Sequence, residues 1–177
     1  TRTLRNAGTA TFGAVGYLYL QNGGVFNNLA TGTFEAQSDY GIYPSGTPGS
    51  FTNAGDFNRT TSSGLFTVNV PITNTGSVVV NSGSLTLSGA GTQTHTGTFN
   101  STGGTLRFAT GTHNLNAGAN VTGTNIAFDS GTISINSVYN VTGTTTVAGG
   151  AVNFNAASTV TNIGANLVFT SGTANFN

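Results

Sequence analysis

Short stretches in which apolar and polar residues alternate run along the whole chain, and a glycine commonly precedes each one. Clear examples occupy residues 76–80, 83–87, 104–108 and 131–135. Alternation with a period of two is typical of β-strands that bury one face, and glycine can supply the positive φ of the turns between them. No stretch of useful length repeats apolar residues at the helical period of about 3.6. The pattern therefore predicts an all-β chain of short strands.

A longer repeat orders these strands. Its steps are 21 to 24 residues long and separate Gly8, Gly32, Gly55, Gly76, Gly97 and Gly118. About three strand motifs fall within each step, which is typical of a three-sided β-solenoid. We therefore predict a single-stranded parallel β-helix (β-solenoid) that forms one domain over residues 1–177. It should have about eight coils of about 20 to 24 residues, with three short strands per coil. A β-sandwich is the alternative, because it also has many short strands and turns.

Stacked coils predict columns of inward side chains. The first column should hold Ala10, Phe34, Phe57, Val78 and Phe99. The second should hold Leu106, Ile126, Val147 and Leu167, and the third Leu115, Ile133, Val152 and Phe176. Asparagines near the corners should hydrogen-bond to turns or to the next coil; they are Asn53, Asn74 and Asn81.

Tyrosines are concentrated in the first quarter of the chain. Alternation predicts that Leu18 and Leu20 point inward while Tyr17 and Tyr19 point outward. Residues 40–50 hold two of the three prolines and interrupt the repeat, so we expect a loop excursion there. Exposed tyrosines suit sugar stacking or a protein interface. The candidate contacts for a ligand or partner are Tyr17, Tyr19, Tyr40 and Tyr43, with packing under the loop as the alternative.

Composition narrows the classes of function. Charged residues make up 5% of the chain, the net charge is zero and lysine is absent, which excludes nucleic-acid binding by a basic face. Cysteine is absent, and no apolar run is long enough for membrane insertion. We expect His95 and His113 at the surface or at corners. We therefore expect no metal site and no cofactor.

One cluster of charged residues has the chemistry of a catalytic site. Glu35 and Asp56 should be diagonal neighbours on adjacent coils, with Asp39 and Arg59 nearby. Clustered carboxylates can act as acid and base in polysaccharide cleavage. The alternative is a surface ion pair without a catalytic role. We predict that the protein is not an enzyme, with a polysaccharide lyase or hydrolase as an alternative.

Four Asn-x-Ser/Thr sequons begin at Asn58, Asn100, Asn120 and Asn140. The repeat places all four outward on one side of the solenoid. Our hypothesis is that this side carries glycans.

The Asn-x-Gly-Thr/Ser units at residues 74–78, 82–87 and 130–135 resemble those of bacterial surface β-helix proteins. These include autotransporter passengers, filamentous-haemagglutinin-like adhesins and extracellular repeat proteins. The resemblance implies a right-handed β-helix at the cell surface or outside the cell, acting as a stalk, adhesin or matrix component. It brings no catalytic residues.

Neither end of the sequence carries an amphipathic helix or a charged cap. Uncapped solenoid ends favour further strand pairing. We therefore expect an extracellular structural protein that stacks end to end into a surface or matrix fibre. Its partners would be copies of itself or flanking coils of a longer chain. The alternative is an adhesin or carbohydrate-binding module with glycan partners.

Overall fold

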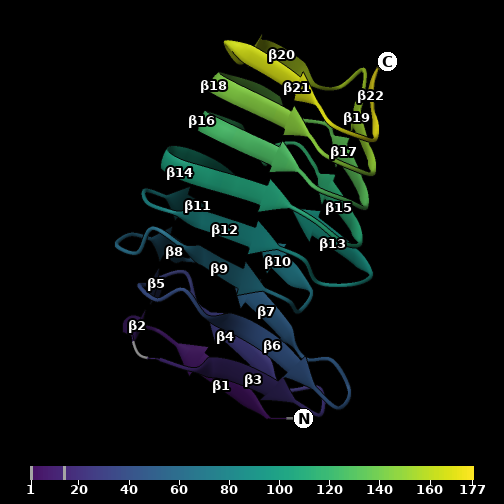
Figure 1. Ribbon diagram of the computed structural model, residues 1–177. Helices are drawn as coiled ribbons and strands as arrows, with labels where there is room; N and C mark the ends of the chain where they lie inside the picture. The colour runs from purple at the N-terminus through teal and green to yellow at the C-terminus, as the bar shows by residue number, and fades with distance from the viewer. Residues whose placement is uncertain (1, 14) are drawn as a thin grey trace.

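The chain winds into a β-solenoid of about eight turns (Figure 1). The computed structural model describes residues 2–13 and 15–177, so Thr1 and Ala14 of the expected domain lie outside the described residues. Throughout this part of the chain the regular elements are strands, and they pair in parallel. The two termini lie at opposite ends of the stack in Figure 1. The predicted fold class is confirmed.

In each full turn the chain passes along three faces, which we name A, B and C in chain order. Face A is one continuous sheet. In chain order it consists of β1 (Thr3–Asn6), β4 (Val25–Asn28), β7 (Ser50–Asn53), β10 (Ile72–Asn74), β13 (Thr92–His95), β15 (Thr112–Leu115), β17 (Thr132–Ile135), β19 (Ala151–Phe154) and β22 (Thr173–Phe176).

Faces B and C are joined into a second sheet, because three long strands run along both faces. These long strands are β14 (Thr98–Phe108), β16 (Val121–Phe128) and β18 (Val138–Val147). The other strands of face B are β2 (Thr9–Phe12), β5 (Thr33–Ala36), β8 (Asp56–Arg59), β11 (Ser77–Val80) and β20 (Thr159–Ile163). Those of face C are β3 (Tyr17–Gln21), β6 (Gly41–Ser45), β9 (Leu65–Val68), β12 (Ser84–Leu87) and β21 (Asn166–Phe169).

The first predicted column of inward side chains is confirmed. Ala10, Phe34, Phe57, Val78 and Phe99 are register partners in successive coils of face B. The last four are buried, and the rings of Phe34 and Phe57 meet edge to face at 5.2 Å. Burying each such side chain contributes about 1.5–3 kcal/mol to stability. The core is therefore a stack of aromatic and aliphatic layers that runs along the rod.

The second predicted column is wrong at one position. Ile126 pairs with Thr145, whereas Val147 pairs with Phe128 in the neighbouring column. The pairing shifts between Gly123 and Asn125, and the inward position opposite Ile126 is Thr145, within the run of threonines before Val147. The buried Thr145 hydroxyl is satisfied there by the Tyr139 hydroxyl at 2.7 Å.

The third predicted column is wrong, because its four residues belong to two different columns of face A. Leu115 pairs with Ile135, and that column continues to Phe176. Ile133 and Val152 share the other column, in which His113 is the partner of Ile133. The error arose because His113, a polar residue, occupies an inward position in β15.

Residues 40–50 do not form the expected loop, because Gly41–Ser45 is strand β6 in register with β3. Only residues 46–49 connect β6 to β7. The register of β6 with β9 ends at Ile42. Pro44 follows closely and has no backbone N–H to donate, which explains why the pairing stops there.

A ladder of asparagine side chains runs up the inside of face A at its corner with face B. The Nδ2 atom of Asn6 donates to the Oδ1 atom of Asn28, Asn28 to Asn53, and Asn53 to Asn74, each at 2.8 Å. The corner hydrogen bonds expected for Asn53 and Asn74 are therefore confirmed. Asn81 is exposed, and its side chain has no hydrogen bond to the described residues.

Candidate functional site

The four candidate tyrosines converge on face C at the N-terminal end of the rod. Tyr17 and Tyr19 lie on β3, Tyr43 lies on β6, and Tyr40 immediately precedes β6. We call these four residues the tyrosine cluster. Its place follows from strand alternation: Leu18 and Leu20 between the outward rings point into the core, as predicted.

The ring of Tyr17 lies at the centre of the tyrosine cluster. Its centroid is 5.1 Å from that of Tyr43, 5.2 Å from that of Tyr40 and 6.1 Å from that of Tyr19. The register partner of Tyr17 is Gly41, and a Cβ there would approach the Tyr43 ring to 3.0 Å. The same Cβ would lie 2.2 Å from the Thr67 carbonyl oxygen, so glycine is required here mainly by the close approach of β9.

The tyrosine cluster combines exposed ring surface with polar hydroxyl groups. The side chains of Tyr17 and Tyr19 are 50% and 52% exposed, while Tyr40 and Tyr43 are half-buried. Aromatic rings of this kind bind apolar ligand faces, and their hydroxyls donate and accept hydrogen bonds. The cluster offers binding chemistry without a nucleophile or a charged group.

The charged cluster does not form a surface ion pair, because Arg59 is fully buried. Its Nη1 atom donates to the carbonyls of Ala36 and Ser38 at 3.1 and 2.7 Å. Its Nη2 atom donates to the Gly64 carbonyl and pairs with the Asp39 carboxylate. Arg59 therefore joins adjacent coils from within and is not a cation available to a surface ligand.

The carboxylate that pairs with Arg59, that of Asp39, is partly exposed to solvent. Hydrogen bonds with the Ser62 side chain and with Arg59 hold the pKa of Asp39 below its usual value of 3.8, although desolvation opposes them. An acid that stays ionised in this way is held as a counter-ion of Arg59. It is poorly placed to donate a proton.

Glu35 and Asp56 lie on adjacent coils and are diagonal neighbours, as predicted. The Glu35 carboxylate already accepts hydrogen bonds from Asn58 at 2.8 Å and from Thr60 at 3.2 Å. Within residues 2–13 and 15–177, no group of three or more His, Asp or Glu side chains is placed to hold a metal ion.

The two histidines do not lie at the surface as expected, since both are buried in face A with their rings stacked 5.5 Å apart. The backbone N–H of Asn74 donates to His95 Nδ1, so the proton of His95 is on Nε2. That N–H donates to His113 Nδ1 at 3.3 Å, and His113 Nε2 donates to the Ala109 carbonyl at 2.9 Å. Gln93 Nε2 lies 3.3 Å from the same His113 atom, but both atoms are donors and do not bond.

This hydrogen-bond chain requires both imidazoles to be neutral. Burial lowers the pKa of His95 from 6.5 to about 3, and a charge on His113 would lower it further. Burial also lowers the pKa of His113, to about 4. The sequence held a signal for His95: it follows Asn74 by 21 residues and continues the asparagine column.

The sequons do not all lie in one column. Asn58 and Asn100 are both partners of Val79, and Asn140 belongs to the same column through Thr122. Asn120 lies outside that column, just before β16, and its Oδ1 accepts a hydrogen bond from the Val138 backbone at 3.4 Å. Three sequons therefore share one line along face B.

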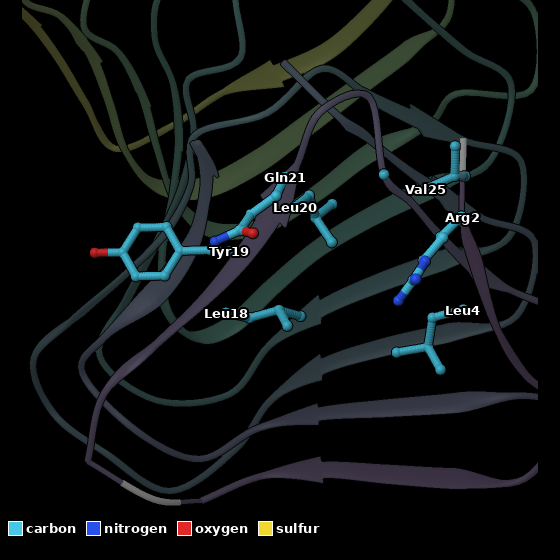
Figure 2. Close-up of a pocket in the computed structure, with 8 residues that line it drawn as sticks. Arg2, Leu4, Leu18, Tyr19, Leu20, Gln21 and Val25 are labelled. Atoms are coloured by element: carbon cyan, nitrogen blue, oxygen red, sulfur yellow. The ribbon is translucent and has the colours of Figure 1, made fainter. Parts of the chain in front are cut away.

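The N-terminal end of the rod is hollowed. Figure 2 shows Leu18 and Leu20 pointing into this space from one side and Leu4 from the other, while Tyr19 points away. Arg2 extends toward the same space. The hollow has a volume of about 260 Å³ and is the open end of the hydrophobic core.

No protein-family model, curated protein or solved structure matches the chain. In the described part of the chain, no helix has the length and apolar character needed to cross a membrane.

Proposed function

We propose that the protein is a non-enzymatic structural element, a length of rigid rod in an extracellular fibre. The observation that carries this proposal is the pair of open ends. Strands β1, β2 and β3 at one end, and β20, β21 and β22 at the other, are the outermost strands of their ladders in the described chain. Their outer backbone N–H and C=O groups are free to pair with further strands.

Both ends also expose side chains that are buried elsewhere in the rod. Leu4 is 55% exposed, although Phe26, its partner in the next coil, is buried. Phe176 is 59% exposed at the other end, although its partner Phe154 is buried. Each end is therefore a cross-section of the core, and covering it with another coil would bury apolar surface.

The surface that best fits such an end is another coil of the same kind. A head-to-tail contact between different ends does not close on itself, so it extends into a fibre. Zero net charge keeps self-repulsion weak. The partner is a second copy or a flanking coil of a longer chain. The repeat units similar to those of bacterial surface β-helix proteins favour a place at the cell surface or in a matrix.

Electron microscopy of the purified protein at rising concentration tests this proposal. We expect rods that lengthen with concentration while their width stays constant. Leu4→Glu and Phe176→Glu place a carboxylate in an end and should stop the growth. Leu65→Glu is the matched control, because Leu65 is 45% exposed on the side of the rod. Single rods at every concentration, or growth that ignores the end variants, would contradict stacking of separate copies and leave flanking coils of a longer chain as the partner.

A further inference from the structure

We propose that the tyrosine cluster is a binding site for a neutral polysaccharide, a function beyond the structural role proposed above. The cluster gathers four of the five tyrosines of the chain on two adjacent coils. The fifth, Tyr139, is buried in the core. The exposed tyrosine surface of the molecule is thus concentrated at one place.

The tyrosine cluster is held in place before any ligand arrives. The inward neighbours Leu20 and Ile42 are buried, and they anchor β3 and β6 to the core. The ring of Tyr17 meets those of Tyr40 and Tyr43 edge to face, at interplanar angles of 82°. Rings that are already packed lose little conformational freedom on binding, which favours affinity from a small contact.

The chemistry of the cluster fits a sugar chain. A pyranose ring has an apolar face of C–H groups and a rim of hydroxyls. The half-exposed rings of Tyr17 and Tyr19 can pack against the apolar face, and phenolic hydroxyls can bond the rim. Tyr19 and Tyr43 are register partners on adjacent coils, so the aromatic surface extends along the rod axis. That direction suits an extended chain.

The electrostatics favour a neutral ligand. The cluster itself contains no charged side chain. Asp39, the sequence neighbour of Tyr40, is already neutralised by Arg59. An anionic polymer would find no free cation within the cluster, and a cationic one would find no free anion there.

The size of the cluster disfavours a protein partner. Stable protein interfaces cover about 800 Å² on each partner. Here Gln21, Ser45 and Thr67 beside the rings are polar, and the exposed apolar residues nearby, Val15 and Leu65, are single side chains. An aromatic patch of four rings supplies contact for a few sugar units. It is small for the apolar centre of a protein interface.

The first test is affinity chromatography of the protein on columns that carry immobilised xyloglucan, galactomannan, mixed-linkage β-glucan or dextran. We expect at least one of these neutral polysaccharides to retard the protein. Tyr17→Ala and Tyr19→Ala should each weaken the retardation at least tenfold, whereas Tyr17→Phe keeps most of it. Leu65→Ala removes an exposed apolar side chain from another coil of face C and should change nothing.

The second test uses the tyrosine fluorescence of a chain that lacks tryptophan. Quenching by acrylamide should fall when the retarding polysaccharide is added. The proposal is overturned if none of the four polymers retards the protein, or if Tyr17→Ala and Tyr19→Ala behave as wild type. Equal retardation by polygalacturonate, or protection from acrylamide by protein concentration alone, would also overturn it. The last result would identify the cluster as a contact between copies. None of these outcomes depends on Leu4 or Phe176, so the rod proposal stands or fails separately.

Discussion

At the corner between faces A and B, glycine is required by lack of space. Gly55, Gly76 and Gly97 follow one another in successive coils, and none of the three has a positive φ. A Cβ on each would lie 2.1 Å from the carbonyl oxygen of the preceding glycine in the series. The close stacking of coils at this corner therefore excludes any side chain.

Gly76→Ala should lower the free energy of unfolding by about 2–4 kcal/mol, because the backbone of two coils must separate. Gly8→Ala is the matched control: it belongs to the same series, but a Cβ added there would meet no atom within 4 Å. Its cost should stay below about 0.5 kcal/mol. Urea unfolding of the two variants measures the difference. Equal losses would show that space at this corner is not limiting.

The sequence revealed the positions of these glycines but not the reason for them. Their spacing predicted the coil correctly, whereas the positive φ expected of glycine turns does not apply at Gly55 or Gly76. His113 shows the opposite difficulty. Its polar side chain hid an inward position, because a partner that satisfies it, the Nε2–H group of His95, lies on the preceding coil and depends on how the coils stack.

Among the elements, β13 and β15 are distinguished by the polar chain that links them inside the core. His95 and His113 accept and donate one hydrogen bond each in this chain. Among the described residues, no Asp, Glu or Arg side chain takes part in it. On the side of the core, the ring of Phe99 packs against His95 and the ring of Phe108 packs against His113, both nearly at right angles. Protonating either imidazole would place a charge in an apolar region and turn an acceptor nitrogen into a donor.

Stability should therefore fall as pH drops below 6.5. The unfolded chain takes up protons on both histidines near pH 6.5, whereas the folded chain does so only near pH 3 to 4. Between pH 6.5 and pH 5 the loss should be about 2 kcal/mol per histidine. This window lies above the usual range of carboxyl groups.

Urea unfolding at several pH values measures this slope. The double variant His95→Asn/His113→Ile is the control, because asparagine continues the ladder and isoleucine matches Ile133 in the next coil. Its unfolding free energy should be nearly level across the same window. A level profile in the wild-type protein would contradict the assignment of neutral, buried histidines.

Strand positions were predictable where the distance from glycine to the first apolar residue is constant. The first column met that condition, and the prediction was right. It failed at Val147, which follows a run of threonines, and at Leu115, which follows His113. For the tyrosine cluster, alternation predicted the outward direction of Tyr17 and Tyr19. Their approach to Tyr43 was not predictable, because the sequence indicated a loop where β6 forms.

On the scale of the whole molecule, each coil contacts mainly the coil before it and the coil after it. The strand pairs join successive coils, and the hydrophobic core continues through them without a break. Stability in such a structure is approximately a sum of coil and neighbour contributions. Removing one complete coil should therefore leave a shorter rod that still folds.

Deletion of residues 132–150 tests this expectation. Thr132 and Ala151 are register partners, so the deletion removes one repeat and brings Val152 into the position of Ile133 beside His113. The shortened protein should keep its β circular dichroism spectrum and a cooperative unfolding transition. Deletion of residues 132–143 removes less of the chain but breaks the register, and it should abolish cooperative unfolding. Loss of folding in both deletions would contradict additive coils.

The asparagine ladder gives the coils a fixed order. Coils of similar sequence could in principle pair in another order or in a shifted register. The ladder runs from Asn6 to Asn74 and reaches His95, after which Leu115 begins an apolar stretch of the same column. A coil displaced by one place would set an amide against leucine, which cannot accept the side-chain hydrogen bond that links successive asparagines. The residues of this column thus distinguish one coil from the next. They favour a single pairing order in a chain whose coils otherwise have similar sequences.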